Sequence, residues 1–187
     1  MGAVTAVARC ERCLSHRLAA VRVPWLRAVL DAVGRAARFT GLWWAISVVL
    51  AVRGGPRGRR AAAEALASVA VAEAGSALVA KRLVHRRRPP PEWAPGGHGH
   101  DRPDSSSFPS AHTAAAVAYT TARARTLPAV GAACAAAAVL VSMQRVTSAA
   151  HWAGDVAAGA VIGAVAARAV HVTARRLGEH GRVGVNR

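Results

Sequence analysis

Five apolar runs, joined by short connections that carry most of the arginines, constrain the fold of this chain more than any other feature. With 53% hydrophobic but only 4% aromatic residues, the composition is unusual for a soluble globule and typical of membrane helices built from small residues. We therefore predict an all-α fold, an integral membrane helical bundle of about five spans plus an N-terminal amphipathic helix. The runs are residues 39–52, 61–84, 110–122, 128–144 and 151–172.

The two ends of the chain are basic. Residues 1–38 hold seven arginines and no uncharged run long enough to span a bilayer, which disfavours a cleavable signal peptide. Leu14 to Val33 has an apolar stripe with Trp25 as an interfacial anchor, which predicts the amphipathic helix; a disordered basic tail is the alternative. The predicted organisation is an N-terminal segment at 1–38, a membrane domain at 39–174 and a basic tail at 175–187.

The net charge of +16 favours contact with anionic headgroups or a phosphate substrate. A coding bias toward Arg and Ala explains much of the excess, but not Lys81, the only lysine in the chain. Two carboxylates in the second apolar run, Glu64 and Glu73, are expected to pair with cations inside the bundle. Cys10 and Cys13 form a lone CxxC with no second ligand pair, so we predict no metal there.

One stretch between the fourth and fifth runs places three chemically active side chains among small and apolar residues. They are Arg145, His151 and Asp155. In a helix beginning near His151, Asp155 lies one turn further on the same face. Its carboxylate could hold one imidazole N–H and leave the other ring nitrogen free, as in a histidine prepared to act as a base or nucleophile.

Two further polar stretches lie at the ends of apolar runs. Lys81 is followed after six residues by Arg88-Pro89, and Phe108-Pro-Ser-Ala-His112 opens the third run. Since antiparallel spans alternate in direction, the end of run two, the start of run three, the end of run four and the start of run five all emerge on one membrane face. Lys81, His112, Arg145 and His151 are therefore expected to converge.

These three stretches, Lys-x6-Arg-Pro, Pro-Ser-Ala-His and Arg-x5-His-x3-Asp, resemble the tripartite signature of the type 2 phosphatidic acid phosphatase family. That family shares its site with the vanadium haloperoxidases, and its motifs are usually KxxxxxxRP, PSGH and SRxxxxxHxxxD. Ala111 stands where the family has Gly, and Gln144 where it has Ser. The resemblance covers roughly residues 40–170 and implies a PAP2-like phosphatase domain.

Phosphate chemistry requires charge neutralisation, positioning and a way to expel the leaving oxygen. Lys81, Arg88 and Arg145 could supply the charge. The start of the third run offers backbone N–H groups at Ser110, Ala111 and His112 as an anion site. The residues alone do not decide which histidine attacks phosphorus.

The family resemblance implies more specific roles. His151 is the nucleophile that becomes a phosphohistidine, Asp155 orients it, and His112 protonates the leaving alkoxide. We accordingly expect a metal-independent hydrolase that acts on a lipid phosphate, either a polyprenyl phosphate or diphosphate or a phosphatidate-like lipid, with no cofactor. Its partners are the substrate and membrane lipids, and homo-oligomerisation stays open.

Two other functions compete with this one. A vanadate-dependent haloperoxidase would use the same residues, with His151 as the vanadate ligand, but such enzymes are usually larger and soluble. A non-catalytic basic membrane protein that binds anionic lipid would predict no particular arrangement of Lys81, His112 and His151. A nucleic-acid partner is not expected, since the stacking aromatics of single-strand binders are missing. His98 and His100 could suggest a metal, but Gly-Gly-His-Gly-His is typical of a flexible loop.

The membrane orientation is set by the arginines. The positive-inside rule makes the face opposite the site cytoplasmic and places the site outside. The site face is also basic, and five spans would put the N-terminus outside too, unless residues 14–33 form an interfacial or re-entrant helix. We expect an integral protein of the cell membrane with an extracytoplasmic site. The opposite face carries the turn 53–60, Arg123, Arg125, Arg175 and Arg176, and the site face Arg82, Arg86, Arg87 and Arg88.

Overall fold

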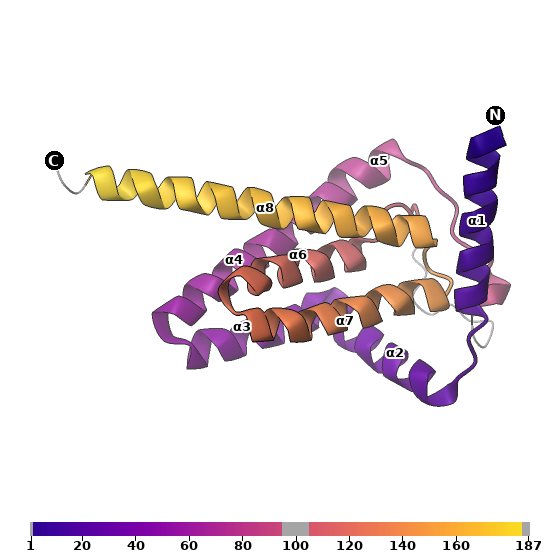
Figure 1. Ribbon diagram of the computed structural model, residues 1–187, viewed down its shortest axis with the longest axis horizontal. Helices are drawn as coiled ribbons and strands as arrows, with labels where there is room; N and C mark the ends of the chain where they lie inside the picture. The colour runs from indigo at the N-terminus through magenta and orange to yellow at the C-terminus, as the bar shows by residue number, and fades with distance from the viewer. Residues whose placement is uncertain (1, 95–104, 185–187) are drawn as a thin grey trace.

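The computed structural model describes residues 2–94 and 105–184, in which every regular element is a helix (Figure 1). Each of the five apolar runs forms a helix. A π-helical turn at Gly75–Ala80 joins α4 to α5, and short 3-10 turns lie at Arg38–Thr40 and Pro91–Trp93. The α-helices are α1 (Gly2–Ala19), α2 (Pro24–Ala36), α3 (Gly41–Arg53), α4 (Gly55–Ala74), α5 (Lys81–Leu83), α6 (Ala111–Thr126), α7 (Pro128–Thr147) and α8 (Ala153–Gly184).

The predicted membrane bundle is confirmed. Three helical stretches among the described residues are long and apolar enough to cross a membrane: Gly55–Leu78, Pro128–Thr147 and Ala153–Leu177. Helices α2 and α3 reach that length only together, as a pair bent by 69°, which would make a fourth span. Helix α6 has 16 residues, or about 24 Å at 1.5 Å per residue, and is shorter than a typical hydrocarbon core.

The N-terminal amphipathic segment differs from the prediction. Instead of one helix over residues 14–33, α1 ends at Ala19 and α2 begins at Pro24. Proline lacks an N–H and disfavours helical backbone in the residue before it. Val23 is accordingly extended, with φ −69° and ψ 112°. The break lets α1 turn across the end of the bundle, as Figure 1 shows.

Helix α6 lies at the centre of the bundle, where it packs against α4, α7 and α8. It approaches α8 closely at the GxxxG pair formed by Gly159 and Gly163. A Cβ atom at Gly159 would lie 2.5 Å from the carbonyl oxygen of Ser110, and one at Gly163 would overlap the carbonyl oxygen of Ala114. The pair therefore permits close backbone contact between the two helices.

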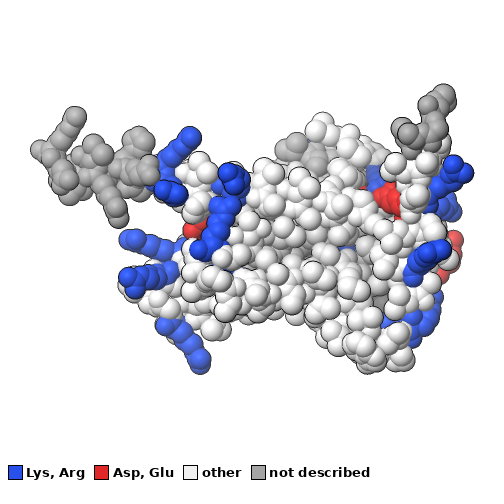
Figure 2. All heavy atoms as spheres, viewed as in Figure 1, with Lys and Arg blue, Asp and Glu red and all other residues white. Residues whose placement is uncertain are grey.

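Charged side chains are distributed as a membrane protein requires. Figure 2 shows Lys and Arg gathered at the two ends of the visible face, with an uncharged band between them. Within the bundle, Glu64 of α4 accepts a hydrogen bond from His171 Nδ1 of α8 at 2.8 Å. Glu64 is therefore paired, but with a histidine rather than with an arginine or lysine, and no ion pair is seen for Glu73 among the described side chains.

Candidate active site

His151 lies in the tight connection between α7 and α8. Ala149 takes a left-handed backbone conformation there, with φ 52°, and the N–H of His151 bonds to the carbonyl oxygen of Arg145 at 3.1 Å. The ring is 5% exposed. The connection thus folds back on the end of α7 and holds the imidazole inside the protein.

The tautomer of His151 follows from its partner. Nδ1 lies 2.6 Å from the backbone carbonyl oxygen of Ser107. A carbonyl oxygen only accepts hydrogen bonds, so Nδ1 carries the proton and the neutral ring has an unprotonated Nε2. The arrangement therefore presents Nε2 with its lone pair, as a nucleophile or base requires.

Asp155 is close to His151 but does not hold it in the way the sequence suggested. Its Oδ2 lies 3.8 Å from Nδ1, too far for a hydrogen bond. That oxygen accepts the N–H of Trp152 at 2.9 Å, and Oδ1 accepts Arg86 Nη1 at 2.7 Å. The expected direct bond is corrected: Ser107 fixes the ring, and Asp155 acts on it as a nearby buried charge.

The protonation of His151 is set by burial and by two charges. Burial lowers the pKa of His151, because the charged imidazolium loses its hydration. Asp155 opposes this effect, whereas the Arg88 guanidinium adds to it. The pKa of His151 stays below its ordinary value, so the ring is neutral at pH 7.

Arg88 connects the loop before α6 to the connection before α8. Its Nη1 donates to the carbonyl oxygen of Ala150 at 2.6 Å, and its Nη2 donates to that of Ser105 at 3.2 Å. Nη2 also donates to the carbonyl oxygen of Ser106 at 3.4 Å. Arg88 therefore lies beside His151, as the sequence predicted, and also fixes the surrounding backbone.

Arg145 is 3% exposed and is held by the residue where this chain departs from the family motif. Its Nε donates to Gln144 Oε1 at 2.6 Å. Gln144 fits because Gly34 of α2 faces it, and a Cβ at position 34 would lie 2.8 Å from Gln144 Cδ. The amide of Gln144 thus orients the arginine.

The start of α6 agrees only in part with the predicted anion site. The N–H of Ser110 is not available, because it donates to the carbonyl oxygen of Asp155 at 3.0 Å. Its hydroxyl caps α6 by accepting the N–H of Thr113 at 3.4 Å. The φ angle of Ala111 is not positive. Ala111 therefore meets the condition for presenting its N–H as the family glycine would. His112 lies in the first turn of α6, next to this contact with α8.

Some predicted positions lie outside what the structure describes. These are the Lys81 side chain, although its backbone begins α5, and both His98 and His100. Cys10 and Cys13 are exposed free thiols on α1. Across residues 2–94 and 105–184, no three His, Cys, Asp or Glu side chains gather as metal ligands would.

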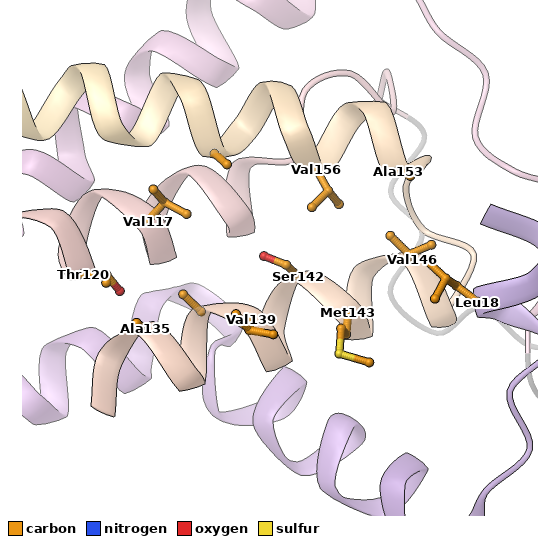
Figure 3. A pocket seen from close by; sticks show the side chains of 12 residues that line it. Leu18, Val117, Thr120, Ala135, Val139, Ser142, Met143, Val146, Ala153 and Val156 are labelled. Carbon is orange, nitrogen blue, oxygen red and sulfur yellow. The ribbon is translucent and has the colours of Figure 1, made fainter. Parts of the chain in front are cut away.

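An open, almost wholly apolar cavity of about 460 Å³ runs between α7 and α8 (Figure 3). Val146 and Ala153 line the end that lies next to the site, and Ser142 and Thr120 supply its few polar groups. Leu18 of α1 closes that same end. The remaining lining residues are Val117, Ala135, Ala138, Val139, Met143, Val156 and Ala160.

Three contributors to the site were missed by sequence reasoning. Ser107 acts through its backbone carbonyl, which leaves no signal in a sequence. Arg86 is one of three consecutive arginines, and nothing distinguishes it from its neighbours. Glu11 binds Arg86 from α1, and its signal is that it is an acid among the arginines of residues 1–38.

Comparisons with known proteins identify the family and support the fold. Residues 61–179 match the family model of the PAP2 superfamily. The fold is similar to the crystal structure of a transmembrane PAP2 type phosphatidylglycerolphosphate phosphatase from Bacillus subtilis, with a TM-score of 0.68 and 24% identity over 91% of this chain and 87% of that one. It is also similar to Aquifex aeolicus LpxE, with a TM-score of 0.67 and 17% identity over 84% and 92%. No curated protein sequence matches significantly.

Proposed function

The chain belongs to the PAP2 superfamily, and from this premise we propose that it is a metal-independent membrane phosphatase that hydrolyses a lipid phosphate through a phosphohistidine intermediate. The substrate is a polyprenyl phosphate or diphosphate, or a phosphatidate-like lipid. The observation that carries the proposal is His151, a buried neutral imidazole whose Nδ1 proton is fixed by Ser107.

The first chemical step is attack of His151 Nε2 on phosphorus. In a monophosphate the bond between phosphorus and the ester oxygen breaks, and His112 gives its proton to the departing alkoxide. In a diphosphate the P–O–P bond breaks, and the proton goes to the departing lipid monophosphate. The imidazole becomes positively charged as the N–P bond forms, and the carboxylate of Asp155, 3.8 Å from Nδ1, stabilises that charge. Asp155 thus contributes most at the transition state rather than in the resting enzyme.

The second step regenerates the enzyme. His112, now neutral, takes a proton from a water molecule whose oxygen attacks the phosphohistidine, and the N–P bond breaks to release inorganic phosphate. Lys81, Arg88 and Arg145 neutralise the phosphate oxygens through both steps, together with the N–H of Ala111. Arginine suits this purpose because its planar fork can bind two phosphate oxygens at once.

The apolar part of the substrate fits the cavity between α7 and α8. Val146 follows Arg145 directly and Ala153 lies two residues after His151, so the cavity begins beside the residues assigned to phosphate. A lipid chain in it would replace contacts with membrane hydrocarbon by contacts with Val139, Met143 and their neighbours. The small, mostly apolar lining favours an acyl or prenyl chain over a polar leaving group.

Phosphate release from a panel of lipid phosphates, measured with purified protein in detergent micelles, tests the function. We expect turnover of at least one lipid, none by His151→Ala, and an acid-labile phosphoenzyme in wild type after a rapid acid quench. Release from no member of the panel would contradict the proposal. Peroxide-dependent bromide oxidation by the vanadate-loaded protein would favour the haloperoxidase alternative instead.

A further inference from the structure

Helix α1 is fixed to the site by one carboxylate. Glu11 Oε1 accepts the N–H of Gly154 at 2.9 Å and Arg86 Nη1 at 3.1 Å, and Glu11 Oε2 accepts Arg86 Nη2. The same Arg86 Nη1 donates to Asp155 Oδ1 at 2.7 Å. One guanidinium therefore lies between an acid of the N-terminal helix and the acid beside the proposed nucleophile.

The contact also completes the start of α8. The first N–H groups of a helix have no partner within it. In α8 two of them are bound by α1, Ala153 N–H by Ser15 Oγ at 3.1 Å and Gly154 N–H by Glu11. Ser15 is 1% exposed, so this is a packed interface. A carboxylate there is also favoured by the helix dipole.

Gly154 leaves the space that the Glu11 carboxylate occupies. A Cβ at position 154 would overlap Glu11 Oε1. Aromatic contacts surround the ion pair, since Arg86 lies over the Trp152 ring at 5.4 Å and Trp93 packs edge-on against Trp152 at 5.7 Å. Because these rings cover part of the cluster, its charges interact more strongly than exposed ones would.

We propose that Glu11 is a positioning residue of the active site, which shares Arg86 with Asp155 and so keeps the Asp155 carboxylate electrostatically available to His151. Without Glu11, Arg86 is neutralised by Asp155 alone, and the surroundings of His151 become more positive by one charge. The developing imidazolium would then be less stabilised. This role rests on the proposed function of His151.

The matched variants are Glu11→Gln, which keeps the shape and the Gly154 contact but removes the charge, and Arg86→Gln, which removes the shared cation. Glu11→Gln should lower kcat about tenfold with little change in KM, a loss typical of one positioned electrostatic contact. The acidic side of the kcat/KM pH profile (the acid limb), where activity falls as His151 is protonated, should move to lower pH in Glu11→Gln because a negative charge is lost. In Arg86→Gln a positive charge is lost, and the acid limb should move to higher pH. Glu92→Gln removes an exposed charge from the same face and should change neither.

The two other charges that act on His151, those of Arg88 and Asp155, are unchanged in every variant. Glu11→Gln with wild-type kcat and pH profile would overturn the proposal. So would an equal loss of kcat in Glu11→Gln and Glu11→Ala with no movement of the acid limb, since a merely structural role predicts that result.

A readout independent of activity separates this proposal from the proposed function. The peptide that spans residues 150–156 should exchange its amide hydrogens faster in Glu11→Ala than in wild type, because the Gly154 N–H loses its acceptor. Unchanged exchange would mean that Glu11 does not hold the Gly154 N–H and would overturn the proposal, whatever the enzyme does. Faster exchange in a protein that releases no phosphate would leave the contact established and reject the function.

Discussion

Gly34 of α2 provides the space that the side chain of Gln144 occupies, and Gln144 in turn holds the guanidinium of Arg145. The two residues belong to different helices, and only one of them lies in a recognisable motif. A substitution at Gly34, which lies outside all three motifs, should therefore change activity through Gln144 and Arg145.

Gly34→Ala should lower kcat/KM about tenfold, or 1.4 kcal/mol, because the new methyl displaces Gln144 and releases Arg145 Nε from its partner. Steady-state phosphate release measures the effect. Combining Gly34→Ala with Gln144→Ser should recover part of the activity, since serine leaves room for the methyl. If the double variant were no better than Gly34→Ala, the effect would arise from α2 packing alone.

The position of the acid limb of kcat/KM depends on His151. Because burial lowers its pKa, the reactive neutral ring persists at acidic pH, and the limb should lie below the ordinary value near 6.5. Asp155→Asn removes the charge that favours the imidazolium, so its limb should move lower still. Arg88→Gln removes a cation and should move the limb higher.

Differences between the pH profiles of these variants distinguish ionisation of the enzyme from ionisation of the substrate. The second ionisation of the phosphate is common to all of them, so only the differences between profiles are interpreted. Asp155→Asn should retain activity between wild type and the inactive His151→Ala. Identical limbs in all three active proteins would show that His151 is not the group that titrates.

Catalysis should need no divalent metal, since arginines supply the positive charge around the substrate. We expect phosphate release to persist in EDTA and orthovanadate to inhibit competitively, because its five-coordinate form resembles the transferring phosphoryl group. Activity that EDTA abolished and magnesium restored would contradict this expectation.

Stability should depend on the contact between α8 and α6. Gly163→Ala would push a methyl into the carbonyl oxygen of Ala114, and overpacking of this kind costs about 1–3 kcal/mol. The melting temperature in detergent should fall. Gly75→Ala is the control, because a Cβ there meets only Ile162 at 3.9 Å. Equal melting temperatures for the two variants would rule out a close-packed interface.

The sequence predicted the bundle from its apolar runs, and motifs at helix ends led us to expect that the site residues converge. It predicted the proximity of His151 and Asp155 from their spacing, but not the partner of the imidazole. That partner, Ser107, contributes a backbone carbonyl 44 residues away. The Asp155 carboxylate instead accepts hydrogen bonds from the N–H of Trp152 and from Arg86.

The contribution of α1 could not be predicted for a related reason. Glu11 and Gly154 are 143 residues apart, and neither lies at a position that defines the motifs. The break at Val23 was visible in principle, because Pro24 is unfavourable inside a helix, but the apolar stripe on both sides of it favoured a single helix. Local patterns therefore identified the residues that we propose react, whereas the residues that hold them are defined only by tertiary structure.

The last prediction concerns the membrane face that carries the site, which we propose is extracytoplasmic. The arginines of residues 53–60, where α3 ends and α4 begins, and those in the last turn of α6 lie at the end opposite the site, and the positive-inside rule places that end in the cytoplasm. Native thiols test this directly. Cys10 and Cys13 are exposed on α1, which Glu11 binds to the site, whereas Cys134 is buried. A membrane-impermeant thiol reagent should label wild type in intact cells. A variant that combines Cys10→Ser, Cys13→Ser and Arg59→Cys, with its thiol at an exposed position of the opposite end, should be labelled only after lysis. The reverse pattern would place the site in the cytoplasm.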